Sequence, residues 1–381
     1  MTTISSTKVM RPQAALPFWL SLAMVPVAVL AALVGGWTVA LLPICSWGMF
    51  SVLDAFVGLN EDNADLETPE SGLIWYRLIT LIWFPVQFAL LLWLLWYVPT
   101  AVHLGLTEIL FLFFGMGIVS GTIGINYAHE LMHQKPAAER WMADLLLASV
   151  LYSHFRSEHL RVHHLYVCTS RDPVTALYNE GFHRFFPRVL VQSLQSAFKA
   201  EAAMLARKGL GPEHISNPFW RYLVLQAGML VLAFVVGGPL GPLLFIFQAM
   251  VAIWQLELVN YIEHYGLTRR HLGDGRYEHV LPRHSWNAAH RASNWLLINL
   301  QRHSDHHYKP DRRFPLLQTY AADEAPQLPY GYPVMTTLAL APPLWRRVMN
   351  KRVKEWRKTY YPDIEDWHPY NKGLHPLPRG A

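Results

Sequence analysis

Charged residues are scarce in this chain of 381 residues: Asp, Glu, Lys and Arg make up 15% of it, whereas 52% of the residues are hydrophobic. Such a composition is too apolar for an ordinary soluble domain. The 2 cysteines, Cys45 and Cys168, are too few and too far apart for a disulfide framework or a cysteine-based metal site, as expected on a reducing side of a membrane. No internal repeat, low-complexity tract or flexible linker marks a second domain. The sequence therefore indicates a single membrane-bound domain, residues 1–381.

Six apolar runs are long enough to cross a membrane as helices. They cover residues 17–35, 37–58, 73–97, 102–126, 219–237 and 239–262. Glycine and proline separate the members of each pair, as in Gly237-Gly238-Pro239, and predict helical hairpins. We therefore predict an all-α integral membrane protein with six transmembrane helices.

The distribution of basic residues predicts the orientation of these helices. The three hairpin tips carry no Lys or Arg, whereas residues 127–218 and the tail after residue 262 hold nearly all of the 32 basic residues. The positive-inside rule places these regions and both termini in the cytoplasm. We expect catalytic cytosolic segments at 127–218 and 263–320, followed by a basic tail at 321–381.

Histidine is abundant, with 19 residues, and four clusters of it fall on the predicted cytosolic side. They read H-E-L-M-H, E-H-L-R-V-H-H, N-Y-I-E-H and Q-R-H-S-D-H-H. Only the first cluster has the H-E-x-x-H pattern of a zinc protease. A single pair of histidines at that spacing arises easily by chance, whereas four histidine clusters do not. The candidate metal ligands are His129, His133, His159, His163, His164, His264, His303, His306 and His307.

Helical spacing predicts which of these histidines point the same way, because residues three or four apart share a helix face. The sets expected to share a face are His129 with His133, His159 with His163, and His303 with His306 and His307. His164 lies off that face, as a residue that reaches a second metal would. Nine imidazoles are too many for one ion and suit two ions with four or five nitrogens each; the alternative is one metal pair with several surface histidines. The other ten, among them His284, are interpreted as loop or surface residues.

Four carboxylates flank the candidate ligands. They are Glu130, Glu158, Glu263 and Asp305. A carboxylate beside a ligating histidine typically accepts the second N–H of the imidazole, and we expect that role here. In the zinc protease interpretation Glu130 is the general base instead. A surface charge without a role is the remaining alternative.

The four clusters resemble those of the integral-membrane alkane hydroxylases, the alkane monooxygenase family that includes the hydroxylase subunits of xylene monooxygenase. Membrane fatty-acid desaturases are more distant relatives. The stretches NYIEHYGL at 260–267 and LQRHSDHH at 300–307 match the family pattern throughout. Val162 stands where the family usually has Gly, and Gln134 intervenes before Lys135, but neither departure removes a ligand.

The resemblance implies a non-haem di-iron monooxygenase that uses O2 and two electrons to hydroxylate the terminal methyl group of n-alkanes. It also implies a bacterial inner-membrane enzyme, with rubredoxin and an NAD(P)H-dependent rubredoxin reductase as electron donors. A fused rubredoxin requires two C-x-x-C pairs, so the 2 isolated cysteines predict a separate donor. The basic run from Arg346 to Lys358 is interpreted as a docking surface for an acidic donor or as a contact with anionic lipid. No motif indicates a nucleic-acid partner.

An alkane has no polar group, so its recognition depends on shape and on apolar burial, at about 0.8 kcal/mol per CH2. We expect a cavity between the spans, with candidate lining residues Trp47, Phe50, Leu53, Phe111, Phe114 and Met116. Methyl-group hydroxylation of alkyl-aromatics is the main alternative function. Fatty-acid desaturation, metal storage and zinc proteolysis are disfavoured, and the protease interpretation leaves three of the four histidine clusters unexplained.

Overall fold

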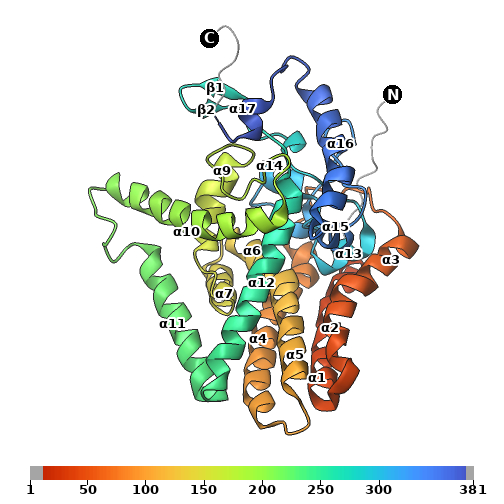
Figure 1. Ribbon diagram of the computed structural model, residues 1–381, viewed down its shortest axis with the longest axis vertical. Coiled ribbons are helices and arrows are strands. Elements are labelled where there is room, and N and C mark those ends of the chain that lie inside the picture. Colours follow the sequence, from red (N-terminus) through yellow and green to blue (C-terminus); the bar gives the residue numbers. More distant parts are fainter. Residues whose placement is uncertain (1–11, 375–381) are drawn as a thin grey trace.

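Six helical spans stand side by side at one end of the molecule (Figure 1). In this computed structural model, which describes residues 12–374, they cover Pro12–Val34, Gly36–Val57, Glu70–Thr100, Leu106–Met132, Pro218–Gly237 and Leu240–His264. Each is long and apolar enough to cross a bilayer, which confirms the predicted six-span, multi-pass membrane protein. The fourth span continues to Met132, beyond the predicted end at residue 126, so His129 lies inside its last turns.

Four of the spans change helix type along their length. The first consists of η1 (Pro12–Ala23) and α1 (Met24–Val34), and the second of η2 (Gly36–Ala40), α2 (Leu41–Pro43), η3 (Ile44–Met49) and α3 (Phe50–Val57). The third consists of η4 (Glu70–Leu73), α4 (Ile74–Tyr97) and η5 (Val98–Thr100), and the fourth of α5 (Leu106–Val119), η6 (Ser120–Ile125) and α6 (Asn126–Met132). The last two are α11 (Pro218–Gly237) and α12 (Leu240–His264). The segments η3 and η6 are π-helical, and such segments occur frequently at functional sites.

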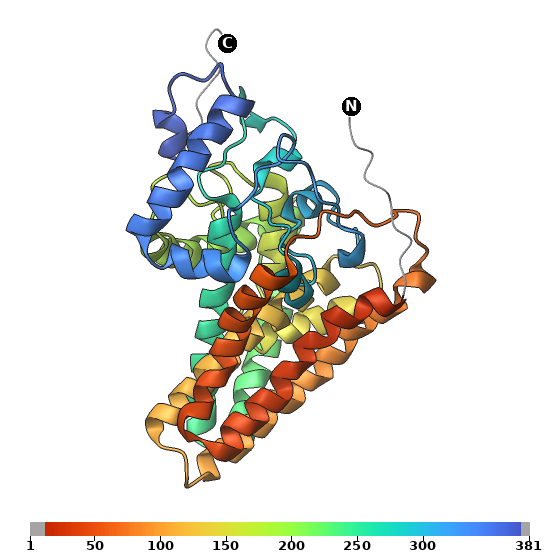
Figure 2. The ribbon, with the colours of Figure 1, turned by 90° about the vertical axis from the view of Figure 1, so that its right-hand side faces the viewer.

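The remaining helices and the one hairpin gather at the other end of the molecule (Figure 2). The helices are α7 (Ala137–Ala148), α8 (Phe155–Glu158), η7 (His159–His163), α9 (His164–Tyr166), α10 (Phe182–Ala206), η8 (Pro282–His284), α13 (Arg291–Leu296), α14 (His303–Tyr308), η9 (Phe314–Leu316), α15 (Tyr332–Ala339), α16 (Pro342–Tyr360) and α17 (His368–Asn371). A small antiparallel hairpin, β1 (His271–Gly273) with β2 (Arg276–Tyr277), is the one sheet in the described residues. The predicted histidine-rich helical region is therefore a compact layer on the ends of the spans.

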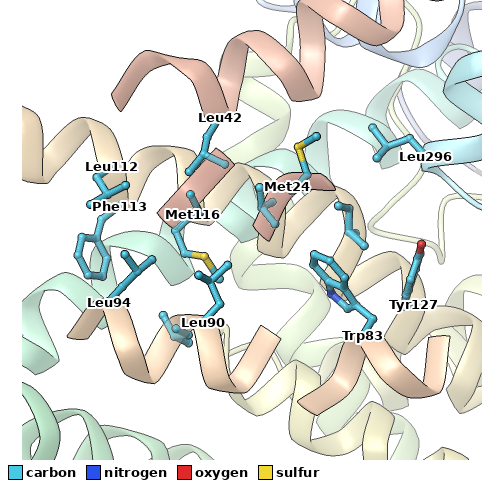
Figure 3. Packing of buried hydrophobic residues seen from close by; sticks show 14 of the residues in the cluster. Met24, Leu42, Trp83, Leu90, Leu94, Leu112, Phe113, Met116, Tyr127 and Leu296 are labelled. Carbon is cyan, nitrogen blue, oxygen red and sulfur yellow. The ribbon is translucent and has the colours of Figure 1, made fainter. Parts of the chain in front are cut away.

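The two largest apolar cores in the described residues hold these parts together. Between the spans, large side chains from α2, α4 and α5 interlock, among them Leu42, Leu94 and Met116 (Figure 3). In the layer above, Trp345 of α16 packs against Tyr261 and Tyr265, with ring centroids 5.2 Å apart in both pairs. The C-terminal region is thus packed onto the end of α12, where it covers the third histidine cluster.

Close packing of α5 and the following η6 against α12 sets the distance between two of the clusters. A Cβ atom on Gly117 would lie 2.5 Å from Cβ of Val251, and one on Gly121 would lie 2.7 Å from the carbonyl oxygen of Ala252. Small residues at such positions let membrane helices approach each other closely. Because α5 leads to His129 and α12 ends at His264, this contact positions both histidines.

We expect Gly117→Ala to destabilise the protein by about 1–3 kcal/mol, because the added methyl group overlaps Val251 on the facing helix. Gly228→Ala is the matched control: it adds the same methyl group on α11, where no atom lies within 4 Å. Thermal unfolding of both variants in detergent checks this. Equal midpoints for the two variants would show that the α5–α12 contact is not tightly packed.

Candidate metal centre

The structure brings all nine candidate histidines together, in two groups. The five-histidine group consists of His129, His133, His159, His164 and His306. The four-histidine group consists of His163, His264, His303 and His307. Within each group, one ring nitrogen of every member lies within 4.8 Å of those of the others. Each predicted ligand therefore converges on one of two centres.

The spacing of nitrogens in the five-histidine group fits a single metal ion. Nε2 of His159 lies 2.9 Å from Nε2 of His129 and 2.9 Å from Nε2 of His164. Nε2 of His306 lies 3.1 Å from Nε2 of His164. Two ligand nitrogens at right angles, each about 2.1 Å from a metal, are about 3 Å apart. The imidazoles are thus arranged as they would be around one ion.

The four-histidine group has the same spacing. Nε2 of His303 lies 3.1 Å from Nε2 of His264 and 3.0 Å from Nε2 of His307. The tautomers of two of these rings also suit a metal site. Nδ1 of His163 lies 3.0 Å from Oδ2 of Asp172, and Nδ1 of His264 lies 3.2 Å from the carbonyl oxygen of His284. Because these oxygens only accept, both Nδ1 atoms carry the proton and both Nε2 atoms keep a lone pair for a metal.

Burial keeps the imidazoles outside the spans neutral. It lowers the pKa of His133 to about 3. It also lowers the pKa well below the usual value for His159, His164, His303, His306 and His307. Neighbouring imidazoles lower these pKa values further, since one positive ring disfavours another. Metal coordination requires the neutral form, so these histidines are prepared to bind a cation.

The second cluster forms a π-helix rather than the α-helix that its spacing predicts. His159–His163 form the π-helix η7, in which hydrogen bonds join residues five apart. His159 and His164, five apart, therefore belong to the same group, and His163 points to the other. The prediction that His159 pairs with His163 while His164 reaches the second metal is wrong for this reason.

The fourth cluster divides between the two groups as well. His303 and His307 of α14 lie in the four-histidine group, whereas His306 belongs to the five-histidine group. A shared helix face therefore does not mean a shared group. In an α-helix, residues three apart differ by about 60° in direction, and this offset separates His306 from His303.

The four predicted carboxylates lie in different surroundings. Oε2 of Glu263 lies 3.3 Å from Nε2 of His303. Glu130 accepts a hydrogen bond from Gln134, and Asp305 pairs with Arg312 and Tyr320. Both oxygens of Glu158 are buried without a hydrogen-bond partner in residues 12–374. The histidine-orienting role of these four residues stays a prediction.

Glu158 also shows that a cation would fit this place. Burial, with the nearby carboxylates of Asp172 and Glu257, raises the pKa of Glu158 well above its usual value. A divalent cation nearby would favour the ionised form and lower that pKa. The donor set and this unpartnered carboxylate therefore both suit a metal ion.

Two residues that contact the ligands were not predicted from the sequence. Asp172 follows His163 by nine residues in a loop, and no motif marks it. His284 was interpreted as a loop or surface residue, but it is fully buried, and its Nε2 lies 2.8 Å from the hydroxyl of Tyr361. Its ring is fixed in place by this contact, and its carbonyl oxygen accepts from His264.

A small apolar cavity of about 30 Å³ lies between the two groups. Its walls include Phe155, Leu256, Val259, Leu297 and Leu300. It also touches His129 and His159 of the five-histidine group and His303 of the four-histidine group. A molecule in this cavity would therefore contact both centres.

The six predicted lining residues lie away from this cavity. Phe50 and Met116 are fully buried in the span core, Trp47 and Phe114 pack against Trp254, Leu53 is half-buried, and Phe111 is 48% exposed. None of the six lines the small cavity. Their role in lining a route from the lipid stays a prediction.

Comparisons with known proteins agree on the kind of protein. The fatty acid desaturase family model matches residues 106–339, which include all four histidine clusters. Alkane 1-monooxygenase 2 of Pseudomonas aeruginosa is 39% identical over 315 residues, which is 81% of this chain and 82% of that protein. Alkane 1-monooxygenase 2 of Alcanivorax borkumensis is 38% identical over 319 residues, 81% of each chain. The xylene/toluene monooxygenase hydroxylase component of Pseudomonas putida is 32% identical over 243 residues, 64% of each chain.

We expect detergent-purified protein to contain about two transition-metal ions per chain, one for each histidine group. His129→Ala and His307→Ala each remove a ligand from one group, so each variant should retain about one ion. The control is His183→Ala, which changes an exposed histidine of α10 outside both groups. Elemental analysis gives the metal content, and a full complement of two ions in both ligand variants would contradict the two-group arrangement.

Proposed function

The chain belongs to the alkane 1-monooxygenase family, and we propose that it hydroxylates the terminal methyl group of n-alkanes to 1-alkanols. One observation carries this proposal: an apolar cavity touches ligands of both histidine groups at the ends of the membrane spans. A hydrolytic zinc site of the H-E-x-x-H type needs two histidines and a general base. It would not explain a second group of four buried histidines.

The proposed cofactors are two iron ions, one in each histidine group, with O2 as co-substrate. When bound, iron supplies the redox chemistry that activates O2 and oxidises a C–H bond, which zinc cannot supply. The nine histidines would hold the ions through their ring nitrogens. Asp172 and the carbonyl oxygen of His284 keep the imidazoles of His163 and His264 in the tautomer that presents Nε2.

The cavity supports an unsubstituted hydrocarbon as substrate. The surface that its walls expose is mainly apolar, although Asn126, Asn260 and Glu263 also line it, and each CH2 group buried there contributes about 0.8 kcal/mol. A volume of about 30 Å³ admits one end of a chain rather than a whole molecule. The remainder then extends between the spans, and Trp47, Phe50, Leu53, Phe111, Phe114 and Met116 are the proposed lining of that route.

Methyl-group hydroxylation of alkyl-aromatics is the second candidate function. The observation in its favour is the similarity to the xylene/toluene monooxygenase component, at 32% identity over 64% of this chain. The alkane 1-monooxygenases are more similar and cover more of the chain, at 39% identity over 81%. We therefore favour alkanes.

The electron donor is a separate protein, and we propose rubredoxin, reduced by an NAD(P)H-dependent rubredoxin reductase. The chain has 2 cysteines, and a rubredoxin site needs four. The exposed side chains of α16 include Arg346, Arg347, Lys351, Lys354 and Lys358, which suit an acidic donor or anionic lipid. The proposed location is the bacterial inner membrane, with the histidine centre and both termini on the cytoplasmic side.

The direct test is oxidation of n-alkanes by the purified protein with rubredoxin, its reductase and NADH. We expect 1-alkanols, detected by gas chromatography, and none when rubredoxin is omitted or when His264→Ala replaces the wild type. His264→Ala should still insert into the membrane, because it changes one residue at the end of a span. Formation of a double bond would indicate a desaturase, and faster turnover of xylene than of any n-alkane would favour the second candidate.

Filling the cavity should block substrate without removing metal. Val259→Phe adds an aromatic ring to a wall of the cavity, and we expect kcat/KM for alkanes to fall on the order of 100-fold, as when a substrate is misplaced by about 1 Å. The control is Val235→Phe on α11, where the native side chain is 73% exposed. Unchanged kinetics in Val259→Phe, with the metal content intact in both variants, would place the substrate elsewhere.

A further inference from the structure

A concave basic surface lies where α16 ends and the chain leads into α17, at the end of the molecule opposite the spans (Figure 1). We call this surface, which has a volume of about 380 Å³, the basic pocket. Its lining includes Lys354, Arg357, Lys358, Tyr361, Ile364 and Trp367, so that three of its residues are cations and none is a carboxylate. Because the spans lie at the other end, a water-soluble partner is better placed to reach this pocket than a bilayer surface is.

Arg357 is fixed in the wall of the basic pocket. Its guanidinium carbon lies 4.3 Å from the ring centroid of Trp367 and 4.5 Å from that of Tyr178, and its Nη2 donates a hydrogen bond of 2.6 Å to Oδ1 of Asn371. Arg357 is 8% exposed, and its Nε has no hydrogen-bond partner in residues 12–374. Within those residues none of the three cations of the pocket forms an ion pair. Buried charges are normally paired, so the pocket suits an anionic group of a partner.

Tyr361 connects the basic pocket to a candidate metal ligand through direct contacts. It lines the pocket, and its hydroxyl lies 2.8 Å from Nε2 of His284. The carbonyl oxygen of His284 lies 3.2 Å from Nδ1 of His264, which belongs to the four-histidine group. Two residues in contact with each other therefore span the distance between the surface and the candidate metal centre.

Hydrogen bonds fix both of these residues. The hydroxyl of Tyr361 donates to Glu278 and accepts from Nε2 of His284, whose Nδ1 accepts a hydrogen bond of 2.9 Å from the backbone N–H of Leu281. The thiol of Cys168 donates to the carbonyl oxygen of His284, with a distance of 3.0 Å. Electrons tunnel more readily through hydrogen bonds and packed atoms than across gaps. The contacts from the pocket to the four-histidine group therefore form a continuous route for electrons.

We propose that the electron donor docks at the basic pocket, and that its electrons reach the four-histidine group through Tyr361 and His284. At each transfer the reduced donor loses an electron and the metal of that group gains it. No bond forms or breaks, and Tyr361 keeps its proton. This inference rests on the proposed function, in which the donor is a separate protein, and it assigns the docking site and the route.

The chemistry of the pocket indicates a small acidic redox protein as the occupant. Carboxylates of such a partner would face the three cations, and charges of opposite sign guide two proteins into a defined orientation. Ile364 and Trp367 add apolar surface among these charges, as in the centre of many protein interfaces. Complexes of electron-transfer proteins are typically small and transient, so a pocket of this size suits one.

The first test measures docking alone, as the Kd of rubredoxin for detergent-purified, metal-free protein by surface plasmon resonance. Lys354→Glu with Lys358→Glu places like charges at the interface, so we expect the Kd to rise at least about ten-fold. Wild-type binding should weaken as salt is added, because salt screens exposed charges. The control is Arg207→Glu with Lys208→Glu, which reverses two exposed charges at the end of α10 and should bind as the wild type does.

The second test measures the route, by stopped-flow oxidation of reduced rubredoxin with the metal-loaded protein. Tyr361→Phe removes the hydroxyl that contacts His284, and we expect the rate constant to fall roughly ten-fold, the lower end of the effect of losing an outer hydrogen-bond partner of a metal site. Its Kd for rubredoxin, its metal content and its reduction by dithionite, which needs no docking site, should match the wild type. Tyr360→Phe, whose hydroxyl donates to the carbonyl oxygen of Asp323, is the matched control.

Wild-type affinity in the double lysine variant would place docking elsewhere. Weaker binding of that variant to vesicles of anionic lipid, with unchanged affinity for rubredoxin, would assign the pocket to the membrane instead. An unchanged rate in Tyr361→Phe would overturn the route, as would loss of metal or equally slow reduction by dithionite. If the wild type oxidises alkanes with rubredoxin while the variants behave as the wild type, the proposed function stands and this inference fails. A wild type that neither binds rubredoxin nor accepts its electrons would overturn both.

Discussion

The rest of the structure depends on the convergence of nine imidazoles, whose nitrogens approach to about 3 Å within two small groups. In the four-histidine group, Nε2 of His303 lies 3.1 Å from that of His264 and 3.0 Å from that of His307. Lone pairs brought together in a buried site repel one another unless a cation lies between them. The protein therefore has to hold these rings in place by other means before a metal binds. The tautomers of His163 and His264 are set by Asp172 and by a carbonyl oxygen, and the elements that carry the rings are packed on every side.

The helical spans supply that rigidity. Gly117 and Gly121 bring α5 and η6 against α12, so that His129 and His264 sit at the ends of two tightly packed helices. Helix α16 then packs on the end of α12, through Trp345 against Tyr261 and Tyr265. The membrane spans and the tail therefore act on the same centre. This explains why no flexible linker separates them in sequence.

Much of this arrangement was predictable because it depends on local pattern. Apolar runs identified the six spans, and the four histidine clusters identified the residues that converge. The division of those residues between two groups was not predictable, because it depends on the π-helix at His159–His163, and α-helical spacing assigns His164 wrongly. Asp172 and His284 were missed for a different reason. Each approaches the site through tertiary packing, and its spacing in sequence to the ligand that it contacts forms no motif.

The position of the centre at the ends of the spans reconciles two requirements of the proposed reaction. A hydrocarbon partitions into lipid, whereas an electron-donor protein approaches from water. The cavity lies on the apolar side, against Leu256 and Val259 of α12, and touches His129 and His303. His133 and His164 of the five-histidine group are half-buried, whereas every member of the four-histidine group is buried. The two groups thus meet at one cavity. For the proposed reaction, this cavity would keep the reacting end of the hydrocarbon among apolar side chains and beside ligands of both groups.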